Sequence, residues 1–211
     1  DQTCCGQPAY TSGYADEARA VAKVQLGLFP NDWPVIVPSG SCAGMMRHHY
    51  PTLFAGDAAL QAKAEALAER VFELTEFFVK VLKVNWKGAG ATKKVALHTS
   101  CSARREMSTH LHARELLAQL GNVELLNHSH ESECCGFGGT FAVRQPDISA
   151  AMAGDKADAL KETGAEKFVS ADGGCLMNID GTLAKRRDSF RGEHLASFLW
   201  HNTEKNEGSK A

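Results

Sequence analysis

This chain of 211 residues has little net charge and no long apolar run, and each absence excludes a class of function. The net charge is only −2, so no basic surface for nucleic acid or for an anionic membrane is predicted. No stretch approaches the roughly 20 apolar residues that a membrane-spanning helix needs, so direct membrane insertion is not expected. The first residues form neither a basic nor an apolar segment, which predicts a cytoplasmic protein without a signal peptide.

Common catalytic signatures are also missing. The glycine-rich residues 136–139 lack the spacing and the lysine of a phosphate-binding loop. We recognise no flavin or nicotinamide signature and no grouping of serine, histidine and aspartate, so catalytic residues stay unassigned. The hydrophobic content of 44% is ordinary for a globular protein.

The cysteines, by contrast, are abundant and patterned. Two adjacent pairs are each followed by glycine, and three lone cysteines lie far from the pairs. The set comprises Cys4, Cys5, Cys42, Cys101, Cys134, Cys135 and Cys175. An odd number of cysteines without an export signal argues against a disulfide framework and favours metal binding or redox chemistry. Unrelated core cysteines would not produce two Cys-Cys-Gly triplets in matching contexts.

The two triplets belong to two copies of an internal repeat. Each triplet is followed by a predicted helix, a short β-branched strand and a glycine turn that ends at a lone cysteine, Cys42 or Cys175. The helices are predicted at residues 16–28 and 148–162 and the strands at residues 35–37 and 168–170.

The second copy has an additional opening. A strand is predicted at residues 94–98, then Cys101, a helix to residue 120 and a strand at residues 123–126. One full copy is therefore a small parallel α/β layer. The first copy lacks this opening, from which we expect roughly 35–45 residues to be missing before Cys4. A first copy that is naturally half-size is the alternative.

A continuous helix is predicted between the copies, over residues 57–83, from an apolar stripe with helical spacing. We expect it to pack across both halves, and a coiled-coil partner is the alternative. The predicted fold class is thus α/β, with two pseudo-repeated small parallel βα layers joined by a long helix. The predicted units are residues 1–56, the connecting helix and linker 57–92, residues 93–201, and a polar, disordered tail 202–211.

The lone cysteines are placed to act as thiolates. Cys42, Cys101 and Cys175 each follow a predicted strand and precede a helix, whose N-terminus lowers the pKa of a thiol. Ligands gather at the carboxyl ends of parallel strands. The second copy has four thiols, which suit a [4Fe–4S] cluster, whereas the first copy has three. Zinc also accepts four thiolates, although its ligands are usually closer in sequence.

Three histidines near the cysteines are weaker candidates. His98 precedes Cys101, while His128 and His130 precede Cys134. Each histidine has the chemistry for a ligand or a proton shuttle. We favour a hydrogen-bonded or exposed loop side chain for each.

The cysteine pattern resembles the cysteine-rich CCG domain. Within it, the sequence is similar to the lactate-utilisation protein A group (the E subunit of an L-lactate dehydrogenase complex), which is related to a cysteine-rich component of heterodisulfide reductase and to the glycolate oxidase iron–sulfur subunit. The segments that carry the resemblance are residues 2–9, 38–43, 133–139 and 172–178.

The resemblance implies an iron–sulfur electron-transfer subunit of a complex that oxidises L-lactate to pyruvate with partner subunits. It implies that the seven cysteines ligate one or two [4Fe–4S] clusters. The fuller motif of the family ends in Cys-x-x-Cys, where this chain has Met45 and Asn178, so a four-thiolate site is favoured. A zinc-stapled assembly scaffold and a thiol–disulfide oxidoreductase of the heterodisulfide type are the alternatives.

Overall fold

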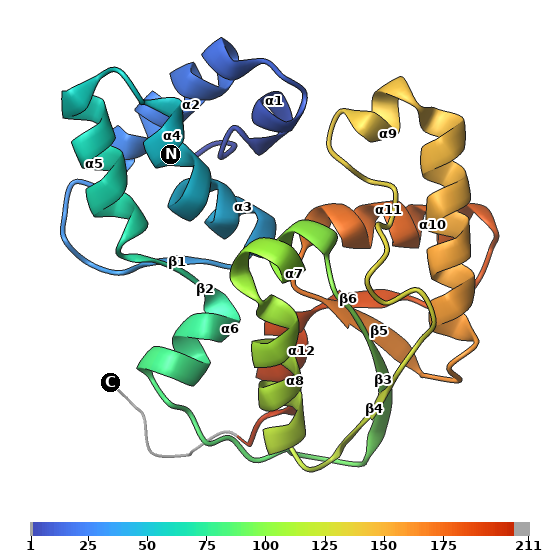
Figure 1. The fold of residues 1–211 in the computed structure, drawn as a ribbon. Coiled ribbons are helices and arrows are strands. Elements are labelled where there is room, and N and C mark those ends of the chain that lie inside the picture. Colours follow the sequence, from blue (N-terminus) through green and yellow to red (C-terminus); the bar gives the residue numbers. More distant parts are fainter. Residues whose placement is uncertain (1, 205–211) are drawn as a thin grey trace.

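Two parallel sheets organise the computed structural model, which describes residues 2–204 (Figure 1). One sheet pairs β1 (Val35–Val37) with β2 (Val71–Glu73) in the N-terminal half. The other has the order β4-β3-β5-β6 in the C-terminal half. The predicted α/β class is confirmed. The four strands predicted from the sequence are all present, to within one residue at each end.

The C-terminal sheet is a three-layer unit with helices on both faces. Its strands are β3 (Lys93–His98), β4 (Val123–Leu126), β5 (Lys167–Ser170) and β6 (Gly192–His194), and all neighbours are parallel. Val95 and Leu97 of β3 pack with α8 (Thr109–Gln119) and α12 (Leu195–Asn202). Ala96 packs with α10 (Pro146–Lys161) and α11 (Gly173–Lys185) on the opposite face. Side chains alternate between faces along a strand, so His98 lies on the α10 and α11 side.

The N-terminal half surrounds its own apolar core. Buried Met45, Met46, Tyr50 and Phe54 lie beneath β1 and β2. Its other elements are α1 (Gln7–Thr11), α2 (Ala15–Leu28), α3 (Gly40–Gly44), the π-helical turn η1 (Met45–His49), α4 (Tyr50–Leu53) and α5 (Ala58–Ala68). The helix predicted at residues 16–28 is α2, and that predicted at 148–162 is α10.

The continuous helix predicted over residues 57–83 is wrong. Asp57 caps α5, which ends at Ala68, and the chain then extends as β2 beside β1. A second helical segment follows as α6 (Leu74–Glu76) and η2 (Phe77–Val81). The apolar stripe therefore serves two cores, because Leu67 packs in the N-terminal half and Phe78 in the C-terminal half. The parallel pairing with β1 overrides the helical spacing.

This strand extends the internal repeat. Glu73 ends β2 and its carboxylate accepts hydrogen bonds from the backbone N–H of Thr75 and Glu76, which start α6. His194 ends β6 and caps α12 in the same way, through Ala196 N–H. Each half thus ends in a parallel strand and a capped helix.

The helix predicted from Cys101 to residue 120 is two helices. α7 (Cys101–Met107) ends at Ser108, whose φ of 51° is left-handed, and α8 begins at Thr109. The break lets α7 pack on α3 of the other half while α8 covers the sheet. A Cβ atom on Gly40 would overlap the Cβ of Ala103, so the two helices approach closely because position 40 is glycine.

Within residues 2–204, no helix is long and apolar enough to cross a membrane. Of the tail predicted to be disordered, residues 205–211 lie outside the described residues, whereas Asn202 ends α12. Thr203 forms an isolated bridge to Gly88 of the predicted linker. The proposed division into units at residues 56, 92 and 201 stays a prediction.

The contact between α3 and α7 is testable by adding one methyl group. Gly40→Ala places a Cβ against Ala103 and 2.9 Å from Cγ2 of Thr109, so we expect the free energy of unfolding to fall by about 1–3 kcal/mol. Gly181→Ala in α11 is the matched control, because no atom lies within 4 Å of its new Cβ; we expect a gain of about 0.5–1 kcal/mol. Equal effects in urea unfolding would contradict the close packing.

Glu73 predicts a pH dependence of stability. Burial raises the pKa of its carboxyl group above the ordinary value, against the opposing hydrogen bonds from Thr75. The folded state therefore holds the proton more tightly, and stability is lost as the pH rises through the folded pKa. Glu73→Gln keeps an oxygen acceptor and removes this titration. We expect its stability relative to the native protein to improve from about pH 4 to about pH 8 in urea unfolding.

The exposed Glu69→Gln, which removes a carboxylate from the surface instead of the interior, serves as the control. A relative stability of Glu73→Gln that stays constant across this range would show that the buried carboxyl group does not titrate as described.

Candidate metal centre

The four cysteines of the second copy gather at the carboxyl edge of the C-terminal sheet. The chain leaves β3 toward β4 on one side and returns to β5 on the other, which makes the gap between β3 and β5 the switch point where α/β folds place ligands. Cys101 follows β3, Cys175 follows β5, and Cys134 and Cys135 lie in the loop after β4. Strand order thus brings together sulfurs that are far apart in sequence.

Hydrogen bonds connect these sulfurs into a chain. The thiols of Cys101 and Cys135 interact with Cys134, and Cys135 also interacts with Cys175. The Cys101 contact is the largest cause that holds the pKa of Cys134 far below its usual range. The contact with Cys134 in turn raises the pKa of Cys101 and of Cys135. A metal that displaces these protons would bind sulfurs that are already in contact.

Backbone amides and glycines complete the pocket. Gly136 N–H donates to Cys134 Sγ over 3.3 Å, with a left-handed φ of 81° that suits glycine. A Cβ at Gly136 would lie 2.5 Å from the Ser149 carbonyl oxygen. Asn178 Nδ2 donates to the Cys135 carbonyl oxygen over 2.8 Å, which holds the pair in place. Asn178 therefore positions the loop from the place where the fuller motif has a cysteine.

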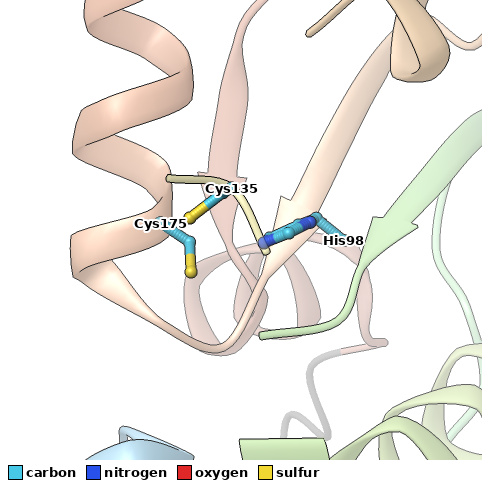
Figure 2. Close-up of side chains that lie close together, drawn as sticks. All are labelled: His98, Cys135 and Cys175. Carbon is cyan, nitrogen blue, oxygen red and sulfur yellow. The ribbon is translucent and has the colours of Figure 1, made fainter. Parts of the chain in front are cut away.

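His98 points into this group of sulfurs. A ring nitrogen of His98 and the sulfurs of Cys135 and Cys175 all lie within 4.8 Å of one another, and all three residues are buried. Figure 2 shows the ring at the end of β3 directed toward both sulfurs. Neither of its ring nitrogens has a hydrogen-bond partner within the described part of the chain. Such a buried unpaired polar group costs about 1–3 kcal/mol.

The three cysteines of the first copy form a second, smaller group. Cys5 is buried and hydrogen-bonds with Cys42, which lowers the pKa of Cys42 to about 7. Cys4 is exposed, and its sulfur accepts from Gly6 N–H over 3.4 Å, as Cys134 does from Gly136. The Tyr50 hydroxyl donates to the Cys5 carbonyl oxygen over 2.8 Å and takes the role that Asn178 has in the other copy.

A cavity of about 340 Å³ opens beside the larger group, between the two halves. Gln7 and Ser41 line it from the N-terminal half, opposite the four cysteines of the second copy. Asp172 also lines it and is buried, with Oδ2 unpaired among the described residues. The charge of Asp172 opposes ionisation of Cys42, so this carboxylate of the cavity wall also acts on the smaller cysteine group. The sequence pattern did not indicate Asp172.

The other histidines near the cysteines have ordinary partners. The ring nitrogens of His128 face carbonyl oxygens, of Ser129 over 2.6 Å and of Leu97 over 3.2 Å, and the nitrogen that carries the proton donates to its carbonyl oxygen. His130 pairs with Glu133 on the surface. The interpretation of these two as loop side chains is consistent with the structure. The same interpretation does not describe His98, which is buried beside Cys135 and Cys175. The alternation of side chains along β3 is the sequence signal that would have indicated this position.

The second group has the donors that an iron–sulfur cluster or zinc requires. It has four thiols, an unpaired imidazole and a backbone N–H on a sulfur, within a cradle in which Gly136 leaves no room for a side chain. The ligand roles of Cys101, Cys134, Cys135 and Cys175, and those of Cys4, Cys5 and Cys42, stay predictions. The first group has three thiols within the described residues.

Comparison with known proteins identifies relatives that cover most of this chain. Lactate utilization protein A 2 of Bacillus cereus (strain Q1) is 41% identical over 199 residues, which is 94% of this chain and 82% of that protein. Lactate utilization protein A of Macrococcus caseolyticus (strain JCSC5402) is 40% identical over 203 residues, with coverage of 96% and 82%.

The cysteine-rich domain family CCG matches residues 1–47 and 95–180, and these two segments contain all seven cysteines. The match omits the stretch that holds α5 and β2, where the predicted continuous helix was wrong. The family match and the long alignments agree with the repeated cysteine groups. The chain belongs to the cysteine-rich CCG domain family, among the lactate utilization A proteins.

Proposed function

We propose that this protein is an iron–sulfur electron-transfer subunit of a complex that oxidises L-lactate to pyruvate. The observation that carries the proposal is the convergence of Cys101, Cys134, Cys135 and Cys175 at the switch point of the sheet. The names of the relatives support the link to lactate. We further propose that the protein works in the cytoplasm with partner subunits that hold the substrate-oxidising centre.

The chain's own residues would hold and tune the centre. A cluster ligated by the four thiolates would accept and pass single electrons. Gly136 N–H stabilises negative charge on Cys134, and such hydrogen bonds to sulfur raise the reduction potential of a centre. Burial of Cys135 and Cys175 limits access of water, while the cavity leaves one side of the group open toward the N-terminal half.

A zinc-stapled scaffold is the second candidate. The grouping of His98 with Cys135 and Cys175 within 4.8 Å also suits a tetrahedral zinc ion. The two candidates differ in acid-labile sulfide and in redox activity, because zinc has neither. A thiol–disulfide oxidoreductase would need Cys134 and Cys135 free to turn over, which a metal bound to both sulfurs would prevent.

Metal analysis tests the proposal. We expect the anaerobically purified protein to contain iron and acid-labile sulfide in equal amounts, about four of each per complete site. We expect Cys175→Ser to abolish the reduced-cluster signal in electron paramagnetic resonance (EPR), because a buried ligand is lost. Cys4→Ser is the control and should retain that signal, because Cys4 belongs to the other group. Zinc without sulfide would reject the proposal.

Electron transfer can be tested in the assembled complex. We expect L-lactate to bleach the visible absorbance of the cluster only when the partner subunits are present, since this chain shows no flavin or nicotinamide signature. D-lactate with the same complex is the control for specificity. Full reduction of the isolated protein by L-lactate would show instead that this subunit oxidises the substrate itself.

A further inference from the structure

His98 is buried without the partners that buried histidines normally have. Its exposure is 1%, and both Nδ1 and Nε2 lack hydrogen bonds among the described residues. His128, which is also buried, has a carbonyl oxygen within hydrogen-bond distance of each ring nitrogen, so its N–H has an acceptor in either tautomer. The same fold region therefore offers carbonyl acceptors to one imidazole and leaves both nitrogens of the other without a partner, although buried polar groups are almost always paired.

The surroundings of His98 favour a neutral imidazole. The ring is buried, and no carboxylate of the described residues hydrogen-bonds to either of its nitrogens. Lys156 is also buried, in α10, where its Nζ contacts the His130 carbonyl oxygen. A neutral imidazole has one nitrogen with a free lone pair, which is the form that binds a metal.

A trapped water cannot satisfy both nitrogens. The void beside His98, which Thr99 and Thr109 also line, has a volume of about 10 Å³. That is about the smallest space that holds one water molecule. One nitrogen can thus be hydrated, while the other is left to the sulfurs of Cys135 and Cys175 within 4.8 Å.

We propose that His98 is a metal ligand, and that one ring nitrogen coordinates the centre held by Cys135 and Cys175 in place of one of the two remaining thiolates, because a [4Fe–4S] cluster takes one protein ligand on each of its four irons. This inference rests on the proposed function, because it specifies the ligands of the same centre. Mixed nitrogen and sulfur ligation places less negative charge on the metal than thiolates alone, and histidine ligands raise the reduction potential of iron–sulfur centres. The end of β3 would thus supply one ligand, His98, and lead directly into the turn that carries Cys101.

Isotope labelling tests the inference directly. The anaerobically purified protein is prepared with ¹⁴N- or ¹⁵N-histidine, reduced with dithionite and measured by pulsed EPR. We expect a strongly coupled nitrogen whose signal changes with the histidine isotope. It should be absent in His98→Gln and present in His128→Gln, the matched control. We expect His98→Cys to retain iron and to shift the midpoint potential downward, because a thiolate replaces a neutral nitrogen.

The outcomes separate this inference from the proposed function. Iron and sulfide in full amount without a strongly coupled histidine nitrogen would overturn the inference and leave the proposed function intact. If sulfide is absent, the proposed function fails, and the ligand is tested with Co²⁺ added to the metal-free protein. A paramagnetically shifted imidazole N–H proton in NMR, lost in His98→Gln and kept in His128→Gln, would then support His98 as a ligand; its absence would overturn it.

Discussion

The structure depends on holding several ionisable sulfurs in contact at one edge of a parallel sheet. The pKa of Cys134 is lowered while those of Cys101 and Cys135 are raised, so the group releases one proton readily and resists losing more. A bound metal ion would supply the positive charge that stabilises further thiolates in this group. The glycine after the second pair is set by close packing on α10, because a side chain at Gly136 would collide with the Ser149 carbonyl oxygen. The loop that carries Cys134 and Cys135 therefore depends on its contact with α10 as well as on its own sequence.

The internal repeat explains how one chain builds two cysteine groups. In each half the second cysteine of the pair is buried and the glycine after the pair has a left-handed φ. A side chain that follows the lone cysteine of each half, Tyr50 after Cys42 or Asn178 after Cys175, hydrogen-bonds to the carbonyl oxygen of that buried cysteine. The halves meet where α3 packs on α7, and Asp172 lines the cavity beside the larger group while its charge acts on Cys42 of the smaller one. The packing of α3 on α7 therefore fixes where the two cysteine groups lie relative to each other.

Local patterns were sufficient for much of the fold. The short runs Val35–Val37 and Val123–Leu126 predicted strands, and the repeat predicted their order around the cysteines. The region after Asp57 was misread because Leu60, Ala64 and Leu67 continue smoothly into Val71 and Leu74 at helical spacing. Only pairing with β1 converts Val71–Glu73 into a strand, and that contact is long-range. The capping motif shared by Glu73 and His194 was the available signal, and it is visible only when the two ends of the repeat are compared.

The sequence by itself determined the α/β class, the duplication and the four thiols of the second group, since these follow from residue type and spacing. The tertiary structure decided which of those residues share a site with others. His98 became a candidate because strand alternation points it at Cys135 and Cys175 and burial removes water from its nitrogens. Asp172 and Lys156 also emerged only from packing, since their charges act through space on residues distant in sequence. Spacing along the chain specifies which donors exist, whereas burial and strand order determine which donors can reach the same ion.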